Sequence, residues 1–168
     1  MKTLVLGVGN ILLSDEGVGV HVVRLLQERY RFPQEVEILD GGTLGLNLLP
    51  YVENADRLVI VDAVQMNVPP GTLVRLEGAE VPAVLGLKYS SHQMGVSELL
   101  AVARVLGHSP AEVILLGIQP ASLEVGLDLS PTVAAQVETL VQNVLAELQR
   151  WGIRPLDSPG SRGPHQEE

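Results

Sequence analysis

The sequence predicts a three-layer α/β/α sandwich, in which a twisted, mostly parallel sheet is flanked by helices on both faces. Two observations support this fold class. Several apolar runs do not alternate with polar residues, as is typical of strands that are covered on both faces. Amphipathic helical patterns lie between these runs, and strands that alternate with helices favour a layered domain with a mostly parallel sheet.

The predicted strands are short apolar runs. Three of them are apolar throughout and are predicted to be central: 4–6, 58–61 and 113–116. The run at 36–39 is a plausible fourth strand. The run at 73–76 follows a Pro-Pro-Gly sequence and is therefore expected nearer an edge of the sheet, because proline cannot donate a ladder hydrogen bond.

The first two predicted helices follow the first two strands. Ser14 or Asp15 is expected to cap a helix that places Val18 and later apolar residues on one stripe. Thr43 is expected to open a short helix that runs through Leu49.

Two further helices carry clear start signals. Ser90 and Gln93 have the spacing of a capping box, and Gly107 is placed to end the helix that follows. The last helix has Ser130 as its N-cap and Pro131 as its first helical residue, before a long apolar stripe.

The chain of 168 residues is expected to form one domain over residues 1–153, because a core of this size would be marginal if it were divided. Residues 154–168 are rich in proline, glycine and polar residues. They contain too little apolar surface to order themselves, so we expect a disordered tail.

Composition excludes several classes of site and partner. The absence of cysteine excludes disulfides, thiolate metal sites and cysteine nucleophiles. The net charge of −9, with no cluster of Lys and Arg, argues against nucleic acid as a partner. No apolar run of about eighteen residues is present. We therefore expect a cytoplasmic protein that has no membrane partner and acts as a monomer.

Acidic residues and one histidine follow the predicted strands. In an open α/β sheet, ligands bind beyond the carboxyl ends of the strands. Glu16 follows the first strand, Asp40 the second and Asp62 the third, and His92 lies in the loop before a later helix. Two carboxylates and one imidazole form a donor set suited to nickel or zinc, with coordination positions left open.

Each of these residues also has a structural interpretation. Glu16 can simply interact with a helix dipole, Asp62 can hold a loop through backbone amides, and His92 can sit in a first helical turn. Nucleotide binding is a second alternative, because Asp40 is placed to meet a ribose. The glycine-bearing turn at 7–10 lacks the third glycine of a dinucleotide fingerprint, however.

Six motifs, in this order, resemble those of the hydrogenase maturation endopeptidases. They are Gly7-Val8-Gly9-Asn10, Asp15-Glu16-Gly17, Leu39-Asp40-Gly41-Gly42-Thr43, Val61-Asp62-Ala63, Ser91-His92-Gln93 and Gly117-Ile118-Gln119-Pro120. The resemblance runs from about residue 2 to residue 151. It implies a cytoplasmic peptidase that removes a C-terminal extension from the nickel-loaded precursor of a nickel-iron hydrogenase large subunit.

The resemblance also assigns residues. Glu16, Asp62 and His92 match the metal-binding positions of the family, and Asp40 matches an aspartate that is associated with activity there. We hypothesise that the nickel is supplied by the precursor, and that a carboxylate (Asp40, Glu16 or Asp62) accepts a proton during metal-dependent peptide hydrolysis. The alternative is a non-catalytic α/β module that docks the precursor or a nucleotide at the same sheet edge.

Overall fold

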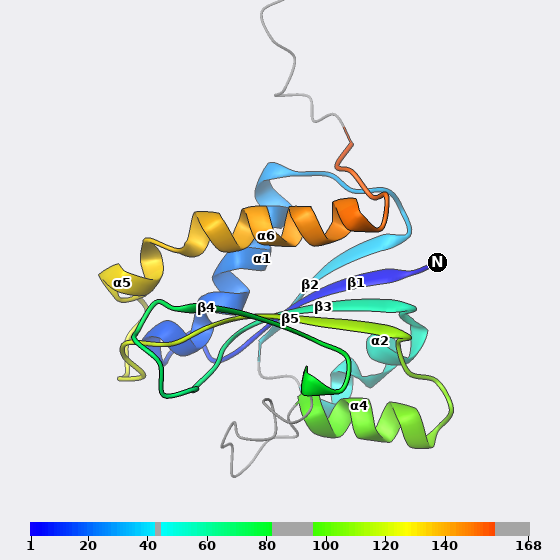
Figure 1. The fold of residues 1–168 in the computed structure, drawn as a ribbon, viewed down its shortest axis with the longest axis horizontal. Coiled ribbons are helices and arrows are strands. Elements are labelled where there is room, and N and C mark those ends of the chain that lie inside the picture. The colour runs from blue at the N-terminus through cyan, green and yellow to red at the C-terminus, as the bar shows by residue number, and fades with distance from the viewer. Residues whose placement is uncertain (43–44, 82–95, 157–168) are drawn as a thin grey trace, which may run out of the picture.

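The computed structural model describes residues 1–42, 45–81 and 96–156. Five strands form its sheet: β1 (Thr3–Val8), β2 (Val36–Gly42), β3 (Arg57–Ala63), β4 (Leu73–Glu77) and β5 (Glu112–Ile118). Their order across the sheet is β2-β1-β3-β5-β4 (Figure 1). All pairs are parallel except β4 with β5, which is antiparallel. The mostly parallel sheet is thus confirmed, with the three unbroken apolar runs at its centre and β4 at an edge.

Helices cover both faces of this sheet (Figure 1). One face carries α1 (Val18–Arg29) and α6 (Val137–Arg150), and the other carries α2 (Leu49–Asn54) and α4 (Val96–Val105). Alternate residues of β3 divide between these layers, as strand geometry requires. Val59 and Val61 pack in the α1/α6 cluster, and Leu58 and Ile60 pack in the α2/α4 cluster. The three-layer prediction is therefore confirmed.

The direction in which the chain leaves β1 creates a switch point. From β1 the chain crosses by α1 to β2 on one side, and it later places β3 on the other side of β1. Gly7 of β1 therefore pairs with Asp40 on β2 and with Val61 on β3. The crevice where strand order reverses lies beyond the carboxyl ends of β1 and β3, which is where α/β sheets bind ligands.

Two predicted helix starts differ from those in the structure. Neither Ser14 nor Asp15 caps α1, which begins at Val18 after a 3-10 turn, η1 (Ser14–Gly17), and has no side-chain cap. The short second helix lies later than predicted, as the 3-10 turn η2 (Gly45–Leu48) followed by α2. Its predicted opening residue, Thr43, lies outside the described residues.

The last predicted helix is divided into two. Ser130 does accept a hydrogen bond from the Val133 N–H, but it caps a four-residue helix, α5 (Pro131–Ala134). A new helix, α6, begins at Val137. The apolar stripe continues across the break, so the sequence pattern does not reveal it.

The end of the described chain contacts the segment between α1 and β2. Leu156 donates its N–H to the carbonyl of Arg31 at 2.6 Å, so the described chain continues three residues past the predicted domain boundary at 153. The rest of the predicted tail lies outside the described residues.

Within the part of the chain that the structure describes, no helix is long and apolar enough to cross a membrane.

Candidate active site

Glu16 and Asp62 both border Gly9 at the switch point. Gly9 has φ +127°, and a Cβ atom there would lie 1.8 Å from the Glu16 carbonyl oxygen and 3.6 Å from Asp62 Oδ1. Only glycine fits this conformation and this space. The Gly9 N–H also donates to the Gly42 carbonyl at 3.0 Å, which ties the ends of β1 and β2 together. The backbone of Glu16 and the carboxylate of Asp62 thus lie next to the same glycine at the sheet edge.

Asp62 is almost fully buried, with 1% of its surface exposed. Its neighbours Val61 and Ala63 pack in the α1/α6 cluster, so strand alternation directs Asp62 to the face covered by α2 and α4. A carboxylate buried to this extent is stable only with hydrogen-bond partners, an opposite charge or a metal.

Glycines bring the segment around Glu16 close to the sheet. A Cβ atom on Gly19, in the first turn of α1, would lie 2.0 Å from the Val61 carbonyl oxygen and 2.8 Å from that of Val8. A Cβ atom on Gly17 would lie 2.7 Å from Ile11 Cα. The backbone that follows the half-buried Glu16 therefore packs directly on the loop after β1 and on the ends of β1 and β3.

Asp15, which we predicted as a helix cap, instead joins two distant loops. Its carboxylate has no exposed surface. It accepts four hydrogen bonds of 2.8–2.9 Å, from the N–H groups of Ala121, Ser122 and Ser130 and from the Ser130 hydroxyl. Burial would raise the pKa of Asp15, but these hydrogen bonds together lower it below its ordinary value. No local pattern indicates this role, because the partners lie more than 100 residues away.

Asp40 lies on the opposite face of the sheet from Asp62. Ile38, two residues earlier on β2, packs against the α1/α6 cluster, and Asp40 follows it on that face. There its Oδ2 is 3.2 Å from Arg24 Nε on α1, and both side chains are partly exposed. The structure thus brings Asp40 to the predicted edge, but pairs it with an arginine.

The third predicted metal ligand, His92, lies outside the described residues. Within the described ranges, no group of three or more His, Cys, Asp and Glu residues is placed to hold a metal ion. The nearest described element after His92 is α4, which begins at Val96. Its amino end is the end nearer the carboxyl edge of the sheet, because α4 finishes close to the start of β5 (Figure 1).

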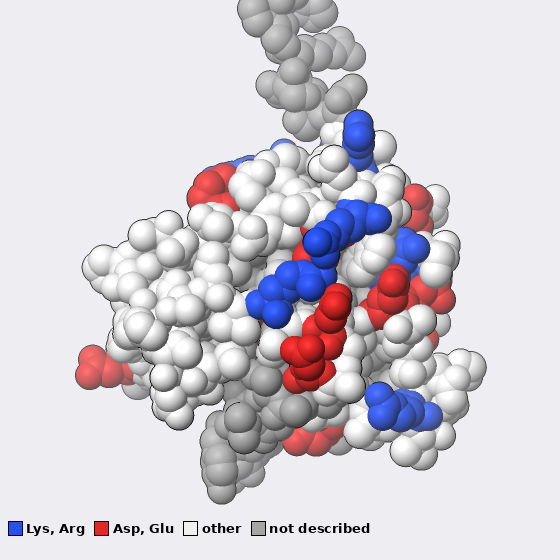
Figure 2. Space-filling view, in the orientation of Figure 1, with Lys and Arg blue, Asp and Glu red and all other residues white. Residues whose placement is uncertain are grey.

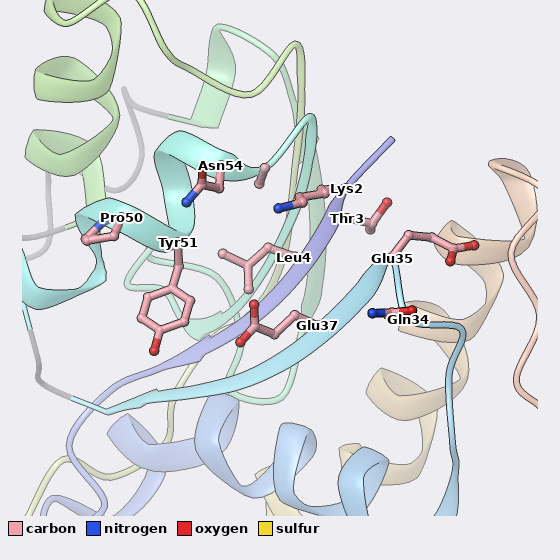
Figure 3. A pocket seen from close by; sticks show the side chains of 10 residues that line it. Lys2, Thr3, Leu4, Gln34, Glu35, Glu37, Pro50, Tyr51 and Asn54 are labelled. Atoms are coloured by element: carbon pink, nitrogen blue, oxygen red, sulfur yellow. The ribbon is translucent and has the colours of Figure 1, made fainter.

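A pocket lies at the other edge of the sheet (Figure 3). Its lining comes from the beginnings of β1 and β2 and from α2, and includes Lys2, Glu37, Tyr51 and Asn54. This is the amino edge of the parallel strands, away from Glu16 and Asp62, so the pocket is separate from the candidate site.

Comparison with known proteins decides the family. The chain matches the sequence profile described as hydrogenase maturation protease over residues 20–147. It is 46% identical to the hydrogenase 2 maturation protease of Escherichia coli K12, over 93% of this chain and 96% of that protein. The chain belongs to the hydrogenase maturation protease family. A second relative in that comparison is the hydrogenase expression/formation protein HupD of Rhodobacter capsulatus, 44% identical over 90% of this chain and 73% of that protein.

Solved structures of maturation proteases share the fold. The E. coli hydrogenase maturating endopeptidase HybD superposes with a TM-score of 0.88 at 45% identity, covering 93% of this chain and 97% of that one. The [NiFe] hydrogenase maturation protease HybD of Thermococcus kodakarensis superposes with a TM-score of 0.67 at 29% identity, covering 86% and 97% of the two chains. The protein is therefore a peptidase of hydrogenase maturation, as the sequence motifs predicted.

Proposed function

We propose that this maturation protease removes the C-terminal extension from the nickel-loaded precursor of a nickel-iron hydrogenase large subunit, and that Glu16, Asp62 and His92 bind the precursor's nickel. The observation that carries the proposal is that the Glu16 backbone and the Asp62 carboxylate both lie next to Gly9 at the switch point. A metal carried by a substrate in that crevice would be within reach of both residues.

The donor set fits nickel as part of the substrate. Carboxylates and an imidazole are ligands that nickel accepts, and a three-residue set leaves positions for ligands from the precursor. Nickel beside the scissile peptide would polarise its carbonyl or lower the pKa of a bound water. Cleavage would then depend on correct metal insertion, because only a metallated precursor is held in place.

A carboxylate at the site also has to accept a proton during hydrolysis. Asp40 is paired with Arg24 on the α1 face, whereas Asp62 is directed to the other face. This arrangement favours Glu16 or Asp62 over Asp40 as the proton acceptor. The assignment places metal binding and proton transfer in the same crevice.

We also propose that the protein works as a monomer in the cytoplasm, without a nucleic acid or membrane partner. The absence of cysteine supports the cytoplasmic location, and the acidic composition argues against nucleic acid as a partner. A non-catalytic module that docks the precursor or a nucleotide is the competing function. Membership in a protease family argues against it, and its decisive test is cleavage.

The test measures the mass of the precursor after incubation with the protein. Loss of a C-terminal peptide from the nickel-loaded precursor, with no change in the nickel-free form, is the expected result. An unchanged mass in both forms contradicts the proposal and supports the binding module.

Variants then test the proposed ligands. Glu16→Gln and His92→Ala should each slow cleavage at least about 100-fold, because losing a metal ligand costs at least as much as losing a residue that supports one. Glu37→Gln, in the pocket at the amino edge, is the matched control and should cleave at the parent's rate. Parent-like cleavage by His92→Ala would show that His92 does not bind the nickel, provided that thermal unfolding shows both variants folded.

A further inference from the structure

An exposed apolar ridge lies next to the candidate site. Four large apolar residues share it: Leu12 (56% exposed), Leu123 (48%), Val125 (88%) and Leu127 (64%). Leu12 belongs to the loop that carries Glu16, and the other three belong to the segment that joins β5 to α5. We call these four residues the apolar ridge.

Backbone hydrogen bonds hold the two halves of the ridge side by side. The Gly126 N–H donates to the Leu12 carbonyl at 2.9 Å, and the Ser14 N–H donates to the Gly126 carbonyl at 2.9 Å. Leu13 and Gly126 form a parallel bridge. The Ser14 hydroxyl also donates to the Glu124 carbonyl at 2.7 Å. The exposure of the ridge is thus a property of an ordered surface.

The buried Asp15 carboxylate holds the same surface in place, because it accepts four hydrogen bonds from residues 121, 122 and 130. The ridge is therefore formed before any partner arrives. A preformed surface binds with a smaller loss of conformational entropy than a loop that must order on contact.

The charges around the ridge indicate what kind of chain would cover it. Residues 9–17 and 119–130 contain no Lys or Arg, and the acids of the ridge segment, Glu124 and Asp128, are exposed. Figure 2 shows the same end of the molecule, on the left, as mostly uncharged surface, whereas charged side chains gather over the other half. Such a surface complements apolar side chains accompanied by a basic one.

We infer that the apolar ridge binds an apolar segment of the protein substrate, and that a basic side chain of that segment meets the exposed Glu124 and Asp128. The inference rests on the proposed function, because the loop that carries Leu12 also carries Glu16. The ridge would then bind the protein substrate, and the substrate's metal would bind in the crevice beyond the carboxyl ends of β1 and β3. A few residues commonly carry most of the binding energy of a protein interface, so a single charge on the ridge is expected to have a measurable effect.

The test is steady-state cleavage of the nickel-loaded precursor by two variants. Val125→Asp should raise KM about tenfold or more and leave kcat close to that of the parent, since it places a charge on the ridge without touching Glu16 or Asp62. Val105→Asp is the matched control. Val105 is 86% exposed at the end of α4, and its variant should keep the parent's KM.

A charge reversal tests the basic part of the segment. Glu124→Lys should also raise KM, and the increase should be larger at low ionic strength, because salt screens the repulsion. Glu124 and Val125 are both exposed, so their variants should unfold at the parent's temperature. If the single changes alter KM only slightly, the triple variant Leu123→Ser, Val125→Ser and Leu127→Ser is measured as well.

The outcomes separate this inference from the proposed function. If the parent fails to cleave the nickel-loaded precursor, the proposed function is wrong. If the parent cleaves, and Val125→Asp, Glu124→Lys and the triple variant all keep its KM, the ridge does not bind the substrate. If the parent sediments as a dimer that Val125→Asp dissociates while KM is unchanged, the ridge joins two copies of the chain, and the inference is also overturned.

Discussion

At the carboxyl edge of the sheet, glycines pack against backbone atoms and a fully buried aspartate accepts four hydrogen bonds. At the amino edge, the charged groups are exposed or partly exposed. The exposed Asp56 carboxylate accepts a hydrogen bond of 2.7 Å from the Lys2 N–H, and the partly exposed Arg57 forms an ion pair with the exposed Glu112 at 3.2 Å. Figure 3 shows the side chains of this amino edge around an open pocket.

The two edges differ in how far their stability depends on the identity of each side chain. Backbone contacts without room for a Cβ, and buried acids with every partner in place, tolerate almost no substitution. Exposed ion pairs contribute little, because water and salt screen them. The carboxyl edge should therefore be sensitive to mutation, and the amino edge should be tolerant.

The largest contrast is expected between two glycines. Gly19→Ala should cost about 3 kcal/mol of unfolding free energy, because the new Cβ would meet the Val61 carbonyl oxygen at 2.0 Å and α1 would have to shift. Gly78→Ala, at the amino edge, meets nothing within 4 Å and should cost only the about 1 kcal/mol of a left-handed backbone. Urea unfolding of the two variants measures both values. Equal losses of unfolding free energy in the two variants would mean that the two edges do not differ in packing.

The next contrast is between two aspartates. Asp15→Ala should cost about 3 kcal/mol at pH 7, because it leaves several N–H groups without their acceptor. Asp56→Ala should cost less than about 1 kcal/mol. Since the folded-state pKa of Asp15 lies below its ordinary value of 3.8, its stabilisation is present above that pH and is lost as the pH falls through the folded-state pKa. The difference between parent and Asp15→Ala should therefore shrink in strongly acidic urea titrations; a constant difference would contradict the assignment.

The smallest effect concerns His21 on α1. Burial, together with Arg24, lowers the pKa of His21 below its ordinary value of 6.5, against the opposing effect of Asp128. Its Nε2 has no hydrogen-bond partner among the described residues. The unfolded chain therefore binds a proton that the folded chain does not, and stability should decrease as the pH falls below about 6.5.

His21→Gln should remove that part of the decrease, by less than about 1 kcal/mol between pH 7 and pH 5. Thermal unfolding across this pH range makes the comparison. A parent-like slope in His21→Gln would exclude His21 as its source.

The sequence predicted the sheet because unbroken apolar runs report burial on both faces, which is a local property. The convergence of Glu16 and Asp62 was also predictable, since parallel strands end at the same edge. The opposite orientation of Asp40 was not, because it depends on the register between β1 and β2. The break between α5 and α6 was missed because the apolar stripe runs through it. His92 lies outside the described residues, so its place at the site stays a prediction.

The long-range hydrogen bonds of Asp15 affect the order in which the protein is made. The loop that carries Glu16 is synthesised early, but its partners at residues 121, 122 and 130 follow 106 to 115 positions later. Contacts this far apart in sequence form late in folding, because a large loop must close first. A chain still emerging from the ribosome would therefore lack these contacts beside the proposed cleavage site until residue 130 of its 168 residues had been translated, and no copy that ends earlier would hold the Glu16 loop in this way.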